Sequence, residues 1–179
     1  MSQQTEEQTI NVGVIGAGGR MGRMLIEAVQ DNPQTTLNAA IERQGSSLVG
    51  ADAGEVAAIG RLEVQIVDDL KAVINDIDVL IDFSLPDATE QNMQICAANK
   101  VAMVIGTTGF NEQQEQVLKE ASKQIAIVYA GNYSTGVNLS LKLLAMAAKA
   151  FGNDADVEVI EAHHKHKIDA PSGTAYMMA

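Results

Sequence analysis

All three histidines of the chain lie in one short segment, interleaved with two lysines. The segment contains His163, His164, Lys165, His166 and Lys167, in a chain whose formal net charge is −11 at pH 7. Crowding of like charges favours the neutral form of each group, which suits proton transfer, and the same cluster attracts carboxylates. The segment therefore predicts a proton-delivering site for a small anionic substrate, with a solvated basic loop as the alternative.

A metal site is the second alternative for this segment. Zinc-binding histidines usually stand at characteristic spacings with further ligands that this segment does not show, so we expect no metal ion. Just downstream, Pro171 and Ser172 lead into Gly173 and Thr174 at the start of an expected helix. The backbone N–H groups of Gly173 and Thr174 predict a second place where an anion binds.

A glycine-rich turn near the N-terminus predicts a phosphate-binding site. It follows a β-branched run and opens a helical pattern, and its residues are Gly16, Ala17, Gly18, Gly19, Arg20, Met21 and Gly22. Glycines let the backbone approach a pyrophosphate, whose charge is stabilised by free N–H groups and the helix dipole. Because Met21 occupies the place of the third glycine in G-x-G-x-x-G, an ordinary tight turn is the alternative.

Two charged neighbours end the next expected strand. Glu42 stands 20 residues beyond Gly22, and Arg43 follows it. A carboxylate here suits the free ribose of NAD, whereas a guanidinium suits the additional phosphate of NADP. The pair predicts that either cofactor is accepted. Arg20 is a further candidate for a phosphate contact, and for both arginines a solvated surface cation is the alternative.

Two further turns of small residues follow expected strands. Their residues are Gly106, Thr107, Thr108 and Gly109 in one turn, and Ala130, Gly131, Asn132 and Tyr133 in the other. Ligands of open α/β sheets bind at the carboxyl ends of the strands, where small residues leave room for a ribose and a nicotinamide ring. Both turns therefore predict cofactor contacts, with ordinary connecting turns as the alternative.

The elements that would position these residues alternate between strands and helices. The apolar patterns predict strands over 9–15, 37–41, 64–67, 78–83, 101–105 and 125–129. They predict helices over 21–31, 69–74, 87–98 and 111–123, the first with Met21, Leu25 and Val29 along one face. This alternation predicts an α/β fold with a doubly wound parallel sheet, the Rossmann type of dinucleotide-binding domain.

A change of composition near residue 130 predicts a domain boundary. We expect a disordered tail over 1–9, a dinucleotide-binding domain over 10–130, and the start of an α+β substrate domain over 131–179. In the last part the patterns predict a long helix over 137–151, a strand over 157–160 and the opening of a helix at 175.

Charge and composition exclude several classes of partner. The acidic net charge argues against binding to nucleic acid or to an anionic membrane surface. Cys96 is the single cysteine, which excludes an internal disulfide and fits the reducing cytoplasm. No segment reaches the roughly 20 apolar residues of a membrane helix, and the polar start does not resemble a signal peptide.

Taken together, the motifs resemble those of the 4-hydroxy-tetrahydrodipicolinate reductases, also called dihydrodipicolinate reductases, of bacterial diaminopimelate and lysine synthesis. The resemblance covers the chain after its tail. It rests on the turns at 16–22 and 106–109, on Glu42 with Arg43, and above all on 161–167 and 169–174.

The resemblance implies that NADPH or NADH reduces 4-hydroxy-tetrahydrodipicolinate, a small cyclic dicarboxylate, to tetrahydrodipicolinate. It implies proton transfer by His163 and Lys167, and substrate carboxylate contacts by His164, Gly173 and Thr174. Implied cofactor contacts fall on Gly16, Ala17, Gly18, Gly19, Arg20, Met21, Glu42, Arg43, Gly106, Thr107, Thr108, Ala130, Gly131, Asn132 and Tyr133.

Members of this family continue well beyond a position equivalent to residue 179. Their additional residues complete the sheet of the second domain, through which the homotetramer forms. We therefore expect a C-terminally truncated member. Two other readings are a fragment that binds the dinucleotide without turnover, and a related nicotinamide dehydrogenase that acts on another small acid.

Overall fold

The computed structural model describes residues 9–163, 165 and 171–179. The chain divides into two compact units, Met1–Tyr129 and Ala130–Ala179, each of which is described by itself. The predicted tail up to residue 8 and the predicted site residues His164 and Lys167 lie outside the described residues.

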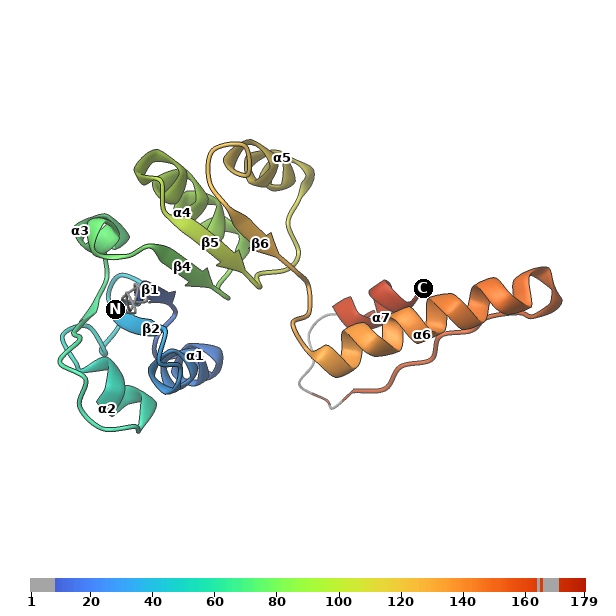
Figure 1. Ribbon diagram of the computed structural model, residues 1–179, viewed down its shortest axis with the longest axis horizontal. Coiled ribbons are helices and arrows are strands. Elements are labelled where there is room, and N and C mark those ends of the chain that lie inside the picture. The colour runs from blue at the N-terminus through green and yellow to red at the C-terminus, as the bar shows by residue number, and fades with distance from the viewer. Residues whose placement is uncertain (1–8, 164, 166–170) are drawn as a thin grey trace, which may run out of the picture. The chain divides into compact units, whose positions relative to one another are not determined.

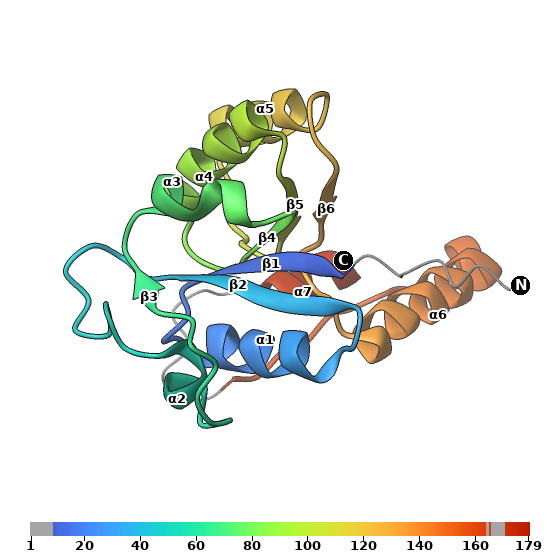
Figure 2. The same ribbon diagram turned by 60° about the vertical axis from the view of Figure 1, so that its left-hand side comes forward.

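The first unit is built on a parallel sheet of six strands in the order β3-β2-β1-β4-β5-β6 (Figures 1 and 2). The strands are β1 Ile10–Ile15, β2 Thr35–Ile41, β3 Ile66–Val67, β4 Val79–Asp82, β5 Ala102–Ile105 and β6 Ile127–Tyr129. The predicted doubly wound α/β fold is confirmed, and each strand lies within one or two residues of its expected range.

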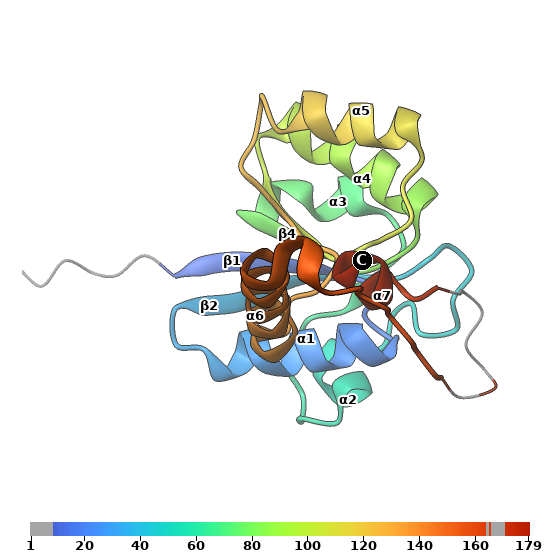
Figure 3. The same ribbon diagram turned by 90° about the vertical axis from the view of Figure 1, so that its right-hand side faces the viewer.

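Helices cover both faces of this sheet. One face carries α1 Arg20–Asp31 and α2 Ala53–Ala57. The other carries α3 Leu70–Val73, the 3₁₀ turn η1 Ile74–Asp76, α4 Pro86–Asn99 and α5 Glu112–Ala121. Figure 2 shows α1 below β1 and β2, and Figure 3 shows α3, α4 and α5 stacked on the opposite side of the sheet.

The alternation of side chains along each strand fills two separate cores. In β4, Val79 and Ile81 pack with Ile26 of α1, whereas Leu80 packs with Met93 of α4. Apolar residues are needed at successive positions because both faces of a parallel sheet are buried. This explains the continuous apolar runs that predicted the strands.

The buried face of α1 differs from the predicted one. Gly22, Ile26 and Val29 are buried, while Met21 is 43% exposed. The spacing of Met21, Leu25 and Val29 is equally helical, but Gly22 must face the strand because there is room only for a hydrogen there. Of the three residues that share the predicted helix face, only Val29 is therefore fully buried.

The short helix α2 was not predicted. The Asp52 side chain caps it by accepting hydrogen bonds from the N–H groups of Gly54 and Glu55, and Ala58 ends it in a left-handed conformation. The same carboxylate accepts from the N–H groups of Leu62 and Glu63 at 3.1 and 2.7 Å. Asp52 thus organises the whole connection between β2 and β3.

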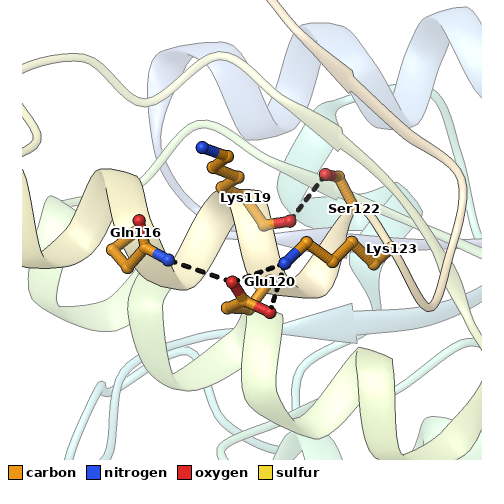
Figure 4. Close-up of polar contacts among 5 residues, drawn as sticks. All are labelled: Gln116, Lys119, Glu120, Ser122 and Lys123. Carbon is orange, nitrogen blue, oxygen red and sulfur yellow. Dashed lines mark hydrogen bonds and ion pairs between the residues drawn. The ribbon is translucent and has the colours of Figure 1, made fainter.

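Polar contacts define both ends of α5. Asn111 and Gln114 form a reciprocal capping box at the start of the helix. At the other end, Lys123 Nζ donates to both oxygens of Glu120, at 2.7 and 2.9 Å (Figure 4). The ammonium group of Lys123 lowers the pKa of Glu120. The pair is exposed, so its effect on stability is small.

The second unit contains α6 Thr135–Phe151, the 3₁₀ turn η2 Gly152–Asp154 and α7 Gly173–Met178. An extended segment follows η2 and runs back along α6, and α7 packs beside α6 (Figure 1). The predicted strand over 157–160 is wrong: within the described residues this segment pairs with no other strand, and Ile160 is 92% exposed. β-branched residues favour an extended chain, but a strand needs a hydrogen-bonded neighbour.

Among the described residues, the longest helices fall short of the length and apolarity that crossing a membrane requires.

Candidate functional site

The glycine turn after β1 is tight because two glycines allow close backbone approach. Gly16 has φ +71°, and the N–H of Gly19 donates to its carbonyl at 2.9 Å. A Cβ at Gly22 would collide with the carbonyl group of Gly16. The turn therefore brings the start of α1 directly against the end of β1.

The N-terminus of α1 has no side-chain cap. Gly19 is the N-cap residue and supplies no side-chain hydrogen bond. In an α-helix the first N–H groups, here those of Arg20 and Met21, have no partner within the helix. Both side chains are exposed, and the neighbouring Arg23 donates from Nε to the carbonyl of Gly18 at 3.0 Å. The helix dipole adds positive potential at this point.

Glu42 connects the end of β2 to the glycine turn. Its Oε1 accepts from the N–H of Gly18 at 2.8 Å, and its Oε2 accepts from the N–H of Arg43 at 3.2 Å. A Cβ at Gly18 would collide with Leu48 and lie 3.1 Å from Glu42 Oε1. Sequence reasoning placed Glu42 at the cofactor but missed this second contact, which holds the carboxylate in place.

A groove of about 1150 Å³ opens beside these residues within the first unit. Its lining includes Gly16, Glu42 and Arg43, the turn residues Ser84 and Leu85, and residues of α3 and α4. The groove thus lies at the carboxyl ends of β1, β2 and β4, where open α/β sheets bind ligands.

The turn after β5 rests on an aromatic ring. A Cβ at Gly106 would collide with the ring of Phe83, and Gly109 has φ +86°. The Thr108 side chain is exposed, but Thr107 is only 3% exposed. Of the two predicted threonine contacts, Thr108 can offer its hydroxyl to a ligand, whereas Thr107 uses its hydroxyl inside the protein.

A buried polar cluster beneath this edge was missed by sequence reasoning. Asp82, at the end of β4, is fully buried. Its Oδ1 accepts from Ser84 Oγ at 2.6 Å, and its Oδ2 accepts from Asn92 Nδ2 at 2.8 Å. Thr107 donates to Oδ1 at 3.5 Å and accepts from Thr89 at 2.8 Å. The cluster fixes the turns after β4 and β5 to α4.

In the second unit, Asn132 organises the segment predicted to contact the cofactor. Its Oδ1 accepts from the N–H of Ser134 at 2.8 Å, and its carbonyl accepts from Asn138 Nδ2 at 3.0 Å. Its Nδ2 lies 3.5 Å from the hydroxyl of Thr174. Tyr133 is 41% exposed. The segment over 130–133 therefore meets a predicted substrate residue, Thr174.

His163 lies beside a carboxylate. Its Nδ1 is 3.2 Å from Glu161 Oε2, and Glu161 Oε1 accepts from the N–H of Ser172 at 2.7 Å. Ser172 caps α7 by accepting from the N–H of Ala175 at 3.1 Å, which places Gly173 and Thr174 in the first turn of that helix. In the part of the chain that the structure describes, histidine, cysteine and carboxylate side chains form no group of three that could hold a metal ion.

A parallel sheet covered by helices, with a glycine turn at the first strand and an uncapped helix behind it, defines a Rossmann-type domain of the kind that binds dinucleotides. The family is shown by two matches. The model described as "Dihydrodipicolinate reductase, N-terminus" matches residues 10–133, and that described as "Dihydrodipicolinate reductase, C-terminus" matches residues 136–179. The chain belongs to the dihydrodipicolinate reductase family. Reductases of this family use NAD(P)H, which their Rossmann domain binds.

Curated relatives agree with this assignment. The chain is 89% identical over 179 residues to a 4-hydroxy-tetrahydrodipicolinate reductase of Psychrobacter arcticus, covering 100% of this chain and 64% of that protein. It is 59% identical to the reductase of Acinetobacter baylyi, covering 93% of this chain and 61% of that protein. The chain thus spans somewhat less than two thirds of the length of these relatives.

Solved structures are also similar. A dipicolinate-bound dihydrodipicolinate reductase from Paenisporosarcina sp. TG-14 matches with a TM-score of 0.74 and 31% identity, covering 96% of this chain and 66% of that one. A scyllo-inositol dehydrogenase from Lactobacillus casei matches with a TM-score of 0.56 at 16% identity, which shows the fold alone.

Proposed function

We propose that the chain carries the cofactor-binding and proton-transfer residues of an enzyme that reduces 4-hydroxy-tetrahydrodipicolinate to tetrahydrodipicolinate in the diaminopimelate pathway. The observation that carries the proposal is the pair of consecutive family matches. One contains the glycine turn and the other contains the histidine-lysine segment.

The cofactor is a nicotinamide dinucleotide bound by the first unit, and it supplies a hydride when bound. The residues present fit such a group, because Gly18 and Gly22 leave a cradle that any side chain would fill and the first N–H groups of α1 have no partner in the helix. Pyrophosphate contacts fall on Gly16, Ala17, Gly18, Gly19, Arg20 and Met21. In the first unit, Gly106, Thr107 and Thr108 contact the nicotinamide half, Thr107 through its backbone because its hydroxyl is used inside the protein. Ala130, Gly131, Asn132 and Tyr133 are cofactor contacts that the family resemblance implies.

Both NADH and NADPH are accepted. The Glu42 carboxylate, held by the N–H of Gly18, suits free ribose hydroxyls. The exposed Arg43 beside it suits the additional phosphate of NADPH.

The second unit provides the substrate contacts and the protons. His163 and Lys167 transfer protons, while His164, Gly173 and Thr174 hold the carboxylates of the substrate. A dianionic substrate explains why a chain of net charge −11 gathers all its histidines with lysines in one segment. Dipicolinate, bound in the Paenisporosarcina enzyme, is a small acid of the same kind.

Two further properties belong to this proposal. The enzyme assembles as a homotetramer, as the family resemblance implies. The reaction takes place in the cytoplasm, a compartment that suits the free, buried thiol of Cys96.

The test combines cofactor binding with turnover. We expect the chain to quench or enhance NADH and NADPH fluorescence on binding, and to oxidise both cofactors when freshly generated substrate is added. His163→Ala and Lys167→Ala should each lower turnover about 100-fold or more, the usual contribution of a positioned proton donor, and leave cofactor affinity near the parent value. Loss of cofactor binding in these two variants would contradict the assigned roles. Binding without turnover in the parent would favour the second candidate, a unit that binds the dinucleotide without activity.

A further inference from the structure

We propose that Glu161 is a positioning residue for His163. One oxygen of its carboxylate fixes the imidazole, and the other fixes the start of α7. The inference rests on the proposed function, since it assigns the group that orients the proton-transferring histidine.

The geometry places one carboxylate between two partners that are distant in sequence. Oε2 lies 3.2 Å from His163 Nδ1, and Oε1 accepts from the N–H of Ser172 at 2.7 Å. Oε2 is shielded from solvent, and the Glu161 side chain is 24% exposed, against 38% for His163. The imidazole lies at ion-pair distance from Oε2, without the alignment of a hydrogen bond. A carboxylate oxygen removed from water in this way favours a protonated nitrogen beside it.

The contact selects which ring nitrogen carries the proton. A neutral imidazole has one N–H, and the partner of the other nitrogen decides which tautomer prevails. A carboxylate at Nδ1 favours the tautomer with the proton on Nδ1, and so leaves Nε2 as the reactive nitrogen. In the proton transfer, the Nε2–H bond of the imidazolium breaks and a bond from the proton to the substrate forms. The Nδ1 proton stays toward Glu161, and no electrons are gained or lost by the histidine.

The second oxygen links this histidine to the proposed carboxylate-binding residues. Ser172 is 5% exposed and caps α7, whose first turn contains Gly173 and Thr174. Holding the Ser172 N–H therefore sets the start of α7 relative to His163. One side chain thereby couples the residue that transfers a proton to the residues that hold the substrate.

The first experiment reads the tautomer directly and does not depend on activity. Long-range ¹H–¹⁵N NMR spectra of the histidine-labelled chain are recorded at a pH where His163 is neutral, and its signals are identified by their loss in His163→Asn. We expect the Nδ1–H tautomer in the parent and in Glu158→Gln, a control at an exposed acid in the same extended segment. Glu161→Gln, which keeps the size and one acceptor oxygen, should shift His163 toward the Nε2–H tautomer. Glu161→Asp keeps the charge on a shorter side chain and should give a tautomer ratio between those of the parent and Glu161→Gln. This variant also serves as the test if Glu161→Gln does not fold.

The second experiment measures turnover. Glu161→Gln should lower kcat by about tenfold or more, part of the contribution of a positioned proton donor, while the KM for the cofactor changes less than twofold. An unchanged His163 tautomer in folded Glu161 variants would overturn the proposal whatever their activity. A shifted tautomer in a chain whose parent shows no turnover would instead support the positioning role and contradict the proposed reductase function.

Discussion

Asp82 was not predicted to contact a ligand, but its hydrogen bonds hold together the turns beside the proposed cofactor site. The carboxylate is fully buried, and its partners Ser84, Asn92 and Thr107 come from three different segments. Two of these segments are the turns that border the proposed cofactor site. A single residue therefore links the apolar core to the binding edge.

Removing the Asp82 carboxylate should lower both stability and cofactor affinity. Asp82→Ala leaves buried donors without a partner, at about 1–3 kcal/mol for each unsatisfied group, so we expect a loss of about 3 kcal/mol. Urea unfolding measures the loss, with the exposed Asp76→Ala as the control. An Asp82→Ala chain as stable as the control, with unchanged cofactor affinity, would refute this role.

The thiol of Cys96 should be unreactive in the folded chain. Burial, with a smaller contribution from the charge of Asp82, raises the pKa of Cys96 to about 12. The reactive species is the thiolate, which is scarce at pH 8 when the pKa lies so far above it. We expect a chromogenic disulfide reagent to label the thiol only after denaturant is added. Rapid labelling of the native chain would contradict the burial of Cys96.

Asp52 should make stability depend on pH in the acid range. Hydrogen bonds from the N–H groups of Leu62, Glu55, Glu63 and Gly54 lower the pKa of Asp52. A lowered pKa means that this contribution is complete above the unfolded value, about 3.9, and is lost as the pH falls through the folded value. Asp52→Asn should therefore lower the Tm at pH 7, and the difference from the parent should shrink below pH 4. Glu55→Gln is the control. If the Tm of Asp52→Asn differed from that of the parent by the same amount at pH 7 and below pH 4, the carboxylate of Asp52 would not be the cause.

Residue types at the site could be predicted from sequence, but their partners could not. Glu42 was expected at the cofactor because it ends the second strand, yet its bond to the Gly18 N–H depends on how the turn folds back. Glu161 belonged to the recognised segment, but only the structure brings Ser172 to it. The buried cluster could have been predicted from Asp82, which ends the apolar run of β4, because a buried charge needs hydrogen-bond partners.

At the scale of elements, the main strands and helices could be predicted from the sequence. A short helix, and a segment that lacks a neighbouring strand, could not be predicted correctly. β1 follows from the apolar run that a sheet buried on both faces requires. α4 lies within one residue of its predicted range, 87–98. α2 has only five residues, and Asp52, which caps it, also depends on the distant N–H groups of Leu62 and Glu63, which the sequence does not reveal. The segment over 157–160 has strand-forming residues but no strand beside it in the described part of the chain.

The start of α1 offers a prediction at this scale. Gly22→Ala introduces a Cβ that collides with the Gly16 carbonyl, so the turn must move away from the helix. We expect a loss of about 1–3 kcal/mol, typical of overpacking, together with at least tenfold weaker cofactor binding. Gly136→Ala in α6 is the matched control, because its Cβ would meet only Ser134 Oγ at 3.8 Å. Equal behaviour of the two variants in urea unfolding and cofactor titration would show that the close approach is unimportant.

For the whole molecule, alternation of strands and helices was sufficient to predict the fold class, because few topologies accommodate a βαβ series. The distribution of charge supports the proposed chemistry at the same scale. An acidic chain repels anions in general, and the clustered cations of one segment give a small dianion a specific place to bind.

The most direct test of the central claim follows a labelled hydride. The chain is incubated with substrate and a nicotinamide cofactor that carries deuterium at the reactive carbon, and the product is analysed by mass spectrometry. We expect tetrahydrodipicolinate that has gained one deuterium. Recovery of unlabelled substrate from a chain that binds the cofactor would contradict it.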